Sequence, residues 1–289
     1  MKSAVLLYNP QSGRGKIDFR VEEICTVFRA YGYDIRPQQI DFAANPFDGN
    51  ETLSLMVVAG GDGTLNFALN AMKRKGLDIP FGVIPAGTAN DFAGALGMSR
   101  HPLEAARQIA QGVEERVDCG CVNGLYFVNV FSFGIFTTTS QRTPDGIKHR
   151  IGKLAYIIEG VKEVSSMHAV PLEIEADGER FDLRSPMVLI FNGETAGGFR
   201  LARRASIKDG LLDCILLEKR DPLRSALAMG QYLLGGNPKI VHHLGARQIE
   251  IRSTVNEPTD VDGQPGAEFP LHITCQAGGL RMICPPSEE

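Results

Sequence analysis

Three short apolar runs in the first third of the chain alternate with glycine-containing turns and helical patterns. The runs are residues 4–8, 53–59 and 81–84. Each precedes a polar turn, and the first turn leads into residues 17–28, whose apolar positions have helical spacing. Short apolar runs bounded by turns are typical of buried strands, and their alternation with helices is typical of a largely parallel sheet. The pattern predicts an α/β domain with its ligand at the carboxyl ends of the strands.

The pattern changes near residue 118. Residues 119–122 and 125–133 flank Asn123-Gly124, which is a strong two-residue hairpin signal. Further β-rich runs follow at residues 172–174, 188–191, 212–217, 249–251, 271–274 and 280–283, with amphipathic helical stretches at 152–164 and 222–234. We therefore expect a second domain that is an antiparallel β-sandwich. The predicted units are residues 1–118, residues 119–283 and a tail, 284–289, for which a return to the first domain stays open.

Composition places the chain among ordinary globular proteins. It has 289 residues, 43% of them hydrophobic, and a formal net charge of −4 at pH 7. This length is enough for two packed cores. The apolar runs are too short or too interrupted to span a bilayer, and Met1-Lys2-Ser3 leads into a strand rather than a signal peptide. We therefore expect a cytoplasmic protein.

The acidic balance argues against nucleic acid as a partner, because binding through phosphate contacts normally leaves a basic footprint. Two compact basic groups nevertheless occur, Lys148-His149-Arg150 with Lys153 and Arg200 with Arg203-Arg204. Near an anionic membrane each such charge can contribute ~1 kcal/mol. These groups are either solvated faces or contacts to a membrane surface.

The most informative motif is the turn after residues 53–59, which reads Gly60-Gly61-Asp62-Gly63-Thr64. Three glycines in four positions allow backbone N–H groups to approach a phosphate at a helix N-terminus. Asp62 does not fit a passive phosphate site, because a carboxylate repels phosphate oxygens unless a cation or a proton lies between them. It indicates metal-assisted phosphoryl chemistry. The alternative is that Asp62 is only a turn or cap residue of the following helix.

The turn after residues 4–8 matches neither of two familiar nucleotide motifs. A Walker loop that ends at Gly15-Lys16 would need a glycine at Pro10, and a dinucleotide loop that starts at Gly13 would need its third glycine at Asp18. Residues 9–16 can still form a backbone nest for a phosphate, with Lys16 or Arg14 as its counter-charge. An ordinary solvated loop is the alternative.

Five blocks of residues, taken together and in order, carry a resemblance. They are Asn9-Pro10-x-Ser12-Gly13-x-Gly15-Lys16, Gly60 to Asn66, Ile84-Pro85-x-Gly87-Thr88-x-Asn90-Asp91-Phe92-Ala93, Ser206-x-x-Asp209-Gly210-Leu211-Leu212-Asp213 and Val261-Asp262-Gly263. Through them the chain resembles the soluble bacterial lipid kinases related to diacylglycerol and sphingosine kinases. The Gly60 to Gly63 element alone is shared with NAD kinases and phosphofructokinases, so by itself it supports only the use of ATP or a polyphosphate.

The resemblance implies a fold and a reaction. The first domain would be an α/β nucleotide-binding kinase domain of the NAD kinase and phosphofructokinase type, and the second a β-sandwich that contributes lipid and metal contacts. In the cleft between them, ATP with Mg²⁺ would phosphorylate the hydroxyl of a diacylglycerol-like lipid. A membrane would present this lipid during transient peripheral contact, and the sequence leaves a homodimer open.

The resemblance also assigns site residues. Those expected at the nucleotide and its phosphates are Asn9, Ser12, Gly13, Lys16, Gly60, Gly61, Asp62, Gly63, Thr64, Asn66, Thr88 and Asn90. Asp62 and Asp91 map onto an acidic network that reaches a catalytic magnesium through water. A second, structural magnesium would take backbone oxygens from Ser206 and Leu211 and the carboxylate of Asp209, which are the ligands a hard cation prefers. Local sequence alone predicts a plain hairpin turn at Asp209.

The chain departs from the family at Gln264. There the family usually carries a glutamate that activates the acceptor hydroxyl together with the aspartate at position 262. A carboxamide can orient a hydroxyl but cannot take its proton. Three possibilities follow. Asp262 could be the base, or Glu268 could take its place as the base. Alternatively, the protein binds nucleotide and lipid with weak or no turnover. We favour a working kinase with Asp262 as the base, because phosphoryl transfer depends mainly on positioning and charge neutralisation.

Two other functions stay open. A NAD kinase would share the Gly60 to Gly63 loop and the domain layout, but it typically has Asn-Glu where this chain has Asn90-Asp91. A non-catalytic module that binds lipid or regulates another protein is suggested by Gln264.

Overall fold

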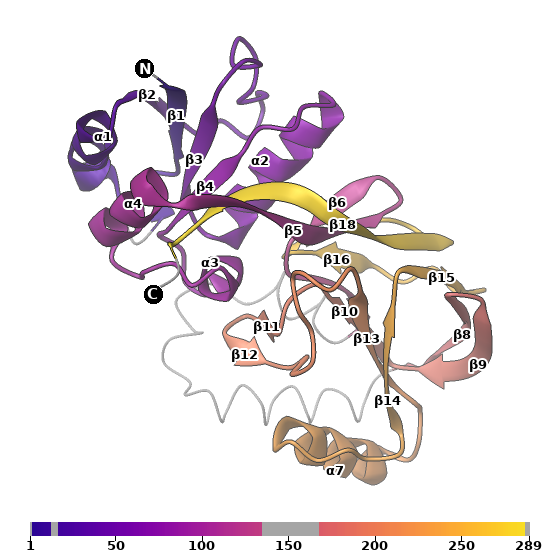
Figure 1. The fold of residues 1–289 in the computed structure, drawn as a ribbon. Coiled ribbons are helices and arrows are strands. Elements are labelled where there is room, and N and C mark those ends of the chain that lie inside the picture. The colour runs from indigo at the N-terminus through magenta and orange to yellow at the C-terminus, as the bar shows by residue number, and fades with distance from the viewer. Residues whose placement is uncertain (1, 13–16, 135–167, 287–289) are drawn as a thin grey trace.

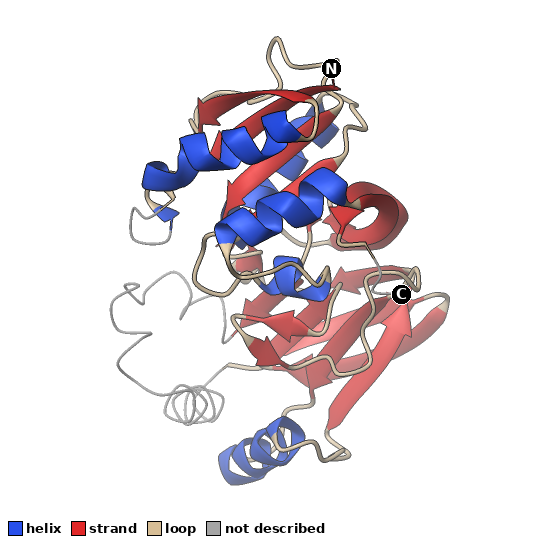
Figure 2. Ribbon diagram, turned by 60° about the vertical axis from the view of Figure 1, so that its left-hand side comes forward, coloured by secondary structure: helices blue, strands red, loops and turns tan. Residues whose placement is uncertain are grey.

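The computed structural model describes residues 2–12, 17–134 and 168–286 (Figure 1; Figure 2). Several predictions from the sequence concern residues outside these ranges. They are the helix at 152–164, the basic group at 148–153, the site residues Gly13 and Lys16, and the last residues of the 284–289 tail.

Strands and helices alternate in the first part of the chain, as the apolar runs predict. The elements are β1 (Lys2–Tyr8), the 3-10 turn Asp18–Arg20, α1 (Val21–Ala30), β2 (Tyr33–Gln39), β3 (Leu55–Gly60), α2 (Asp62–Arg74), β4 (Phe81–Pro85), α3 (Asp91–Ala95) and α4 (Pro102–Gln111). β1 pairs in parallel with β2 and β3, and β3 pairs in parallel with β4. The sequence analysis does not predict β2, which contains Pro37. This proline is tolerated because β2 lies at the edge of the sheet.

The second part of the chain is rich in short strands. Its elements are β5 (Val113–Val122), β6 (Leu125–Phe127), β7 (Val130–Gly134), β8 (Val170–Ala176), β9 (Glu179–Ser185), β10 (Met187–Phe191), β11 (Thr195–Ala196), β12 (Phe199–Arg200), β13 (Leu212–Leu217), α7 (Pro222–Leu233), β14 (Val241–Ala246), β15 (Gln248–Arg252), β16 (Thr259–Val261), β17 (Gln264–Pro265) and β18 (Leu271–Cys284). The hairpin predicted at Asn123-Gly124 joins β5 to β6, and both turn residues have positive φ.

Two large sheets organise the chain (Figure 1). The first runs in the order β2-β1-β3-β4-β18-β15-β8-β9, with β5 beside β18 and β6 beside β5, so it extends through both parts. The second is antiparallel, in the order β14-β13-β10-β7-β16-β17. Apolar side chains from the second part of the first sheet, such as Ile249 and Ile273, share one buried cluster with Phe131 and Ile190 of the second sheet. The predicted α/β domain followed by an antiparallel β-sandwich is therefore confirmed.

The two strands predicted at 271–274 and 280–283 are one long strand, β18. Its pairing with β5 shifts register between Gln276 and Leu280, where Gly278 has φ +59°. A bulge of this kind bends a strand without ending it. β18 therefore leaves the sandwich beside β15 and reaches β4, where Met282 pairs with Phe81.

The single strand predicted at 125–133 is interrupted instead. β6 ends at Phe127 and β7 begins at Val130. The backbone N–H groups of Val128, Asn129 and Val130 all donate to the carboxylate of Asp262. The strand breaks because these amides point to a side chain rather than to a neighbouring strand.

α7 agrees with the helix predicted at 222–234 and packs on the outer face of the second sheet. Ala228 and Met229 are buried, and Met229 belongs to a small core with Ile215 and Leu217 of this sheet. None of the helices in the described ranges is long and apolar enough to cross a membrane.

The pairing of Gly120 with Phe127 gives a test of sandwich packing. A Cβ at Gly120 would overlap the Phe127 ring, so Gly120→Ala is expected to lower the free energy of unfolding by about 1–3 kcal/mol. Gly230→Ala in α7 is the matched control, since nothing lies within 4 Å of its added Cβ. It is expected to raise stability by about 0.5–1 kcal/mol. Urea unfolding measures both, and equal effects would contradict the packing argument.

Candidate active site

The turns that follow β3 and β4 touch through their glycines. A Cβ on Gly61 would lie 3.0 Å from the Cα of Gly87, and a Cβ on Gly60 would lie 2.6 Å from the Cβ of Thr64. Gly61 is also the N-cap residue of α2, in extended backbone. Because side chains are absent here, both turns bring their backbones to the N-terminus of α2, which favours bound anions. The predicted phosphate loop therefore has the geometry of an anion site.

Asp62 ties the two turns together. Its carboxylate accepts hydrogen bonds from the backbone N–H groups of Asp91 (3.2 Å) and Phe92 (3.1 Å), at the start of α3. Asp91 is itself 8% exposed, and its carboxylate accepts from the N–H of Gly198 at 3.0 Å, in the β11–β12 hairpin. Burial, followed by the negative charge of Asp62, raises the pKa of Asp91. Two carboxylates held this close are a site that a cation would stabilise.

Asn129 is a site residue that the sequence analysis misses. Its Nδ2 donates to Asp62 at 3.0 Å, and its backbone N–H donates to Asp262 at 3.0 Å. The residue is 6% exposed. It therefore joins Asp62 of the first domain to Asp262 of the second, two of the three acids predicted to be catalytic. The signal that could have found it is the only amide side chain in the mainly apolar run of residues 125–133.

The carboxylate of Asp262 is surrounded by N–H donors. Oδ2 accepts from Val128 at 2.7 Å and from Nδ2 of Asn66 at 2.9 Å, and Oδ1 accepts from Asn129 and Val130. Burial raises the pKa of Asp262 to about 6, although these four donors act in the opposite direction. A carboxylate has roughly four lone-pair positions. In this conformation each position has a donor.

Other predicted nucleotide residues hold the backbone in shape. The side chain of Asn90 accepts from the N–H of Gly87 (2.8 Å) and donates to its carbonyl (2.9 Å), which closes the turn after β4. Asn66 donates to Asp262 and to the carbonyl of Tyr126. Both side-chain amides therefore make hydrogen bonds within the protein, and their contacts to a nucleotide stay predictions.

The remaining described nucleotide residues border the same strand ends. The N–H of Asn9 donates to Ala59 at 3.1 Å, which joins the end of β1 to the end of β3. The N–H of Ser12 donates to the carbonyl of Asn9. Thr64 is buried in the first turn of α2, and Thr88 is exposed beside Gly87. The fold thus collects these residues from three turns at one edge of the sheet.

Gln264 reaches the phosphate loop from the other domain. It is exposed, and its Nε2 would lie 4.0 Å from a Cβ on Gly63. Glu268 is exposed on the segment after β17, where its carbonyl accepts from the side chain of Asn123. The glutamine is therefore placed beside the N-terminus of α2.

The predicted metal ligands occupy one turn before β13. The carboxylate of Asp209 accepts from the N–H of Leu211 at 3.0 Å, and Ser206 precedes them in the same turn. Partial burial and the negative charges of Asp213 and Asp118 raise the pKa of Asp209. Asp118 already accepts from the N–H groups of Gly210 and Gly278, so Asp209 is the carboxylate of this turn that a hard cation would use with backbone oxygens. No group of three or more acidic, histidine or cysteine side chains in the described ranges could hold a metal by itself.

Two family models match consecutive parts of this chain. One is the diacylglycerol kinase catalytic domain, over residues 3–122, and the other is the "YegS C-terminal NAD kinase beta sandwich-like domain", over residues 129–284. A diacylglycerol kinase of Bacillus subtilis (strain 168) is 31% identical over 99% of this chain and 97% of its own length. This chain belongs to the diacylglycerol kinase family. It is a diacylglycerol kinase-like enzyme, as the five sequence blocks predict.

Further relatives agree with this family. A diacylglycerol kinase of Staphylococcus aureus (strain bovine RF122 / ET3-1) is 31% identical over 94% of this chain and 89% of its own length. A solved structure of a diacylglycerol kinase from Bacillus anthracis str. Sterne superposes with a TM-score of 0.81, covering 99% of this chain and 98% of that one. At 24% identity, that likeness supports the fold alone.

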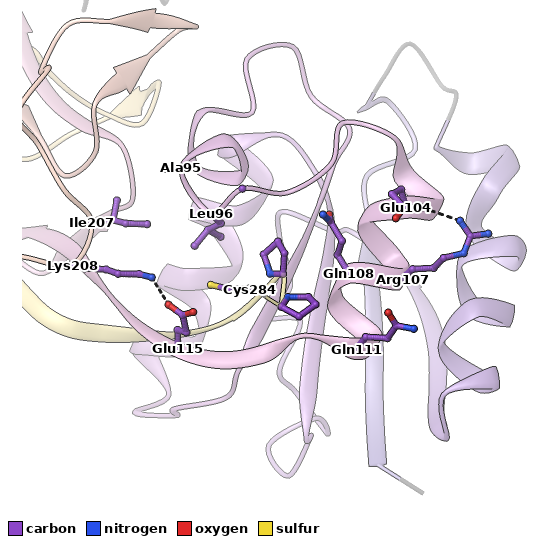
Figure 3. Close-up of a pocket in the computed structure, with 13 residues that line it drawn as sticks. Ala95, Leu96, Glu104, Arg107, Gln108, Gln111, Glu115, Ile207, Lys208 and Cys284 are labelled. Carbon is purple, nitrogen blue, oxygen red and sulfur yellow. Dashed lines mark hydrogen bonds and ion pairs between the residues drawn. The ribbon is translucent and has the colours of Figure 1, made fainter. Parts of the chain in front are cut away.

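A separate cavity of about 530 Å³ lies between α4, the end of α3 and the start of β5 (Figure 3). It is lined by Leu96, Gln108 and Cys284 among others, and its lining groups Lys208 and Glu115 form an ion pair. None of the predicted site residues lines this cavity. It is therefore distinct from the predicted kinase site.

The donors around Asp262 give a stability prediction. Asp262→Asn places an NH₂ group against N–H donors, so at least one buried donor loses its acceptor. Each loss costs about 1–3 kcal/mol, and we expect the free energy of unfolding to fall by at least that amount. Asp177→Asn is the matched control, because Asp177 also accepts backbone N–H groups, from Arg247 and Gln248, but in an exposed turn. Urea unfolding that shows equal losses for both variants would contradict this role of Asp262.

Proposed function

We propose that this enzyme transfers the γ-phosphoryl group of ATP, with Mg²⁺, to the hydroxyl of diacylglycerol or a closely related membrane lipid. The observation that carries the proposal is the hydrogen-bonded chain Asp91–Asp62–Asn129–Asp262, which crosses from one domain to the other at the N-terminus of α2. This arrangement combines an anion site with carboxylates that need a cation. The family supplies the class of acceptor.

The donor side of the reaction follows from the loop geometry. The polyphosphate of ATP would lie along the turns that contain Gly60, Gly61 and Gly87, where no Cβ blocks the backbone. Mg²⁺ would neutralise charge on the phosphate oxygens, and Asp62 and Asp91 would hold it through water. The hydrogen bonds from backbone N–H groups would hold both acids in position before substrate binds. Catalysis of phosphoryl transfer depends mainly on such positioning and on electrostatic stabilisation.

The acceptor side departs from our expectation for Asp262. Four N–H donors occupy its carboxylate, so we propose that Asp262 positions the junction between domains rather than taking the acceptor's proton. Gln264, beside Gly63, would orient the acceptor hydroxyl. Catalysis would then depend on alignment and charge neutralisation, without a strong base.

A transfer assay tests the proposal. Purified protein with Mg²⁺ and γ-labelled ATP is expected to label diacylglycerol in mixed micelles, and EDTA is expected to abolish the transfer. Asp62→Asn should lower kcat by a factor of about 10³ or more, because it removes a charge on which the metal depends. One buried N–H donor to Asp62 also loses its acceptor, so the free energy of unfolding should fall by about 1–3 kcal/mol, but the variant should stay folded under assay conditions. The control Asp177→Asn, in an exposed turn, should keep both its stability and full turnover.

Three results would contradict the proposal. Labelling of NAD but of no lipid would favour a NAD kinase. Absence of transfer to diacylglycerol, monoacylglycerol, sphingoid bases and phosphatidylglycerol would favour a non-catalytic module. Unfolding of Asp62→Asn would indicate that this residue is only structural.

Gln264→Glu tests the role of the amide. The substitution adds a carboxylate with free oxygens beside the acceptor, so we expect kcat to rise by about tenfold or more, as general-base assistance gives. Glu268→Gln is the control, and it should leave kcat unchanged. A rate that stays the same or falls in Gln264→Glu would mean that another group already takes the proton, and a loss in Glu268→Gln would identify that group.

A further inference from the structure

α7 presents three large apolar side chains to solvent. Leu223, Leu227 and Leu234 are 69%, 65% and 90% exposed. Leu223 and Leu227 lie within the helix, and Leu234 is its C-cap residue. At 3.6 residues per turn, positions four and eleven apart fall within about 40° of one another. The three leucines therefore form one stripe along the helix.

The opposite side of α7 is already packed. Ser225, Ala228 and Met229 are buried, and Met229 packs with residues of the second sheet. The hydroxyl of Tyr232 donates to the carbonyl of Leu201 at 2.9 Å. The helix is therefore fixed with its leucine stripe outward, at the end of the molecule away from β1 to β4 (Figure 1). An outward stripe on a fixed helix is typical of a surface that contacts something apolar.

Basic side chains lie at the C-terminal end of α7, where Arg203 contacts the carbonyl of Leu233, next to Leu234 in the chain. Arg203, Arg204 and Lys239 line a cavity of about 530 Å³ that also includes Tyr232 of α7. Among the described residues, none of these three cations forms a salt bridge, whereas Arg220 and Arg224 are paired with Glu218 and Asp221. Together they add three positive charges at one end of a chain whose formal net charge is −4. The surface is complementary to anionic head groups over an apolar layer.

A short length of chain connects this surface to the candidate active site. Arg203 donates to the carbonyl of Leu233 at 3.1 Å, and five residues earlier the N–H of Gly198 donates to Asp91. Five extended residues span at most about 18 Å. The hairpin that contacts Asp91 therefore lies close to the C-terminal end of α7.

We propose that the leucine stripe of α7, with Arg203, Arg204 and Lys239, is the surface on which the enzyme docks to an anionic lipid bilayer. The leucines enter the apolar edge of the bilayer, and the cations contact the lipid phosphates. The proposal rests on the proposed function, because it assumes that the acceptor lipid is drawn from the same bilayer. Docking here places the β11–β12 hairpin, which contacts Asp91, near the membrane.

The chain contains no tryptophan, so Leu227→Trp gives a single fluorescent reporter on the proposed surface. Vesicles of equal parts phosphatidylglycerol and phosphatidylcholine are expected to shift its emission to the blue and protect it from acrylamide. Val113→Trp is the control, since Val113 is 47% exposed at the start of β5, next to α4. Its emission should not change. A blue shift at Val113 with none at Leu227 would overturn the proposal.

Vesicle sedimentation measures the contribution of each part. Leu223→Gln with Leu227→Gln is expected to weaken binding about a hundredfold, because two leucines lose their burial. Arg204→Ala and Lys239→Ala should each weaken it about fivefold, and pure phosphatidylcholine should bind less than the mixed vesicles. Val113→Gln with Val255→Gln removes two exposed apolar groups elsewhere and should bind normally. Unchanged binding of the leucine pair would contradict the proposal.

Two measurements separate this proposal from its alternatives. The double variant Leu223→Gln with Leu227→Gln should phosphorylate a short-chain diacylglycerol, dissolved as monomer, at the normal rate. It should phosphorylate a long-chain acceptor in vesicles more slowly than the unaltered protein does. Transfer to neither acceptor by the unaltered protein would refute the proposed function while fluorescence and sedimentation still test docking. Light scattering that shows dimers of the unaltered protein and monomers of the leucine pair, with no effect on vesicle binding, would assign the stripe to a second copy and overturn docking.

Discussion

The carboxylate of Asp262 is the interaction on which the site depends. It lies between three elements that are far apart in sequence: the break between β6 and β7, the turn before β17, and α2. A buried charge is unfavourable by several kcal/mol unless it is hydrogen-bonded, and each charge-assisted bond returns about 1.5–3 kcal/mol. The four N–H donors therefore make the buried charge tolerable. Of these four donors, Asn66 is the one that belongs to the first domain, and its bond to Asp262 joins the first domain to the second.

The remaining polar contacts extend this junction toward the nucleotide loops. The backbone N–H of Asn129 donates to Asp262, and its side chain donates to Asp62. Asp62 in turn accepts from the N–H of Phe92 at the start of α3. Asp91 is held from the opposite side by Gly198. Each acid is oriented by N–H groups rather than by a basic side chain. The negative charges consequently remain available to a divalent cation, whereas a lysine or arginine partner would have neutralised them.

Features that depend on residues close together in the sequence could be predicted, whereas features that depend on distant residues could not. The strand at Leu212–Leu217 and the loop at Gly60 to Gly63 depend on local pattern and turn chemistry, and both agree with the structure. The break at Val128 and Asn129 depends on an acid more than 130 residues away, which no local pattern reveals. Asn66 illustrates the same limit, because its amide points at Asp262, 196 residues distant. The resemblance located the site, but the assignment of individual side chains required the fold.

The same electrostatics give a reason for Gln264. Burial and then the charge of Asp62 raise the pKa of Asp91, and burial raises that of Asp262, so the site disfavours additional negative charge. A glutamate beside Gly63 would add a base that raises kcat, but its carboxylate would lie near the N-terminus of α2, where phosphate must bind, and would weaken nucleotide binding. An amide avoids that repulsion and can donate a hydrogen bond to a phosphate or hydroxyl oxygen. The chain therefore gains a donor for alignment and gives up a base, a trade that phosphoryl transfer tolerates better than most reactions because its transition state depends on positioned charge.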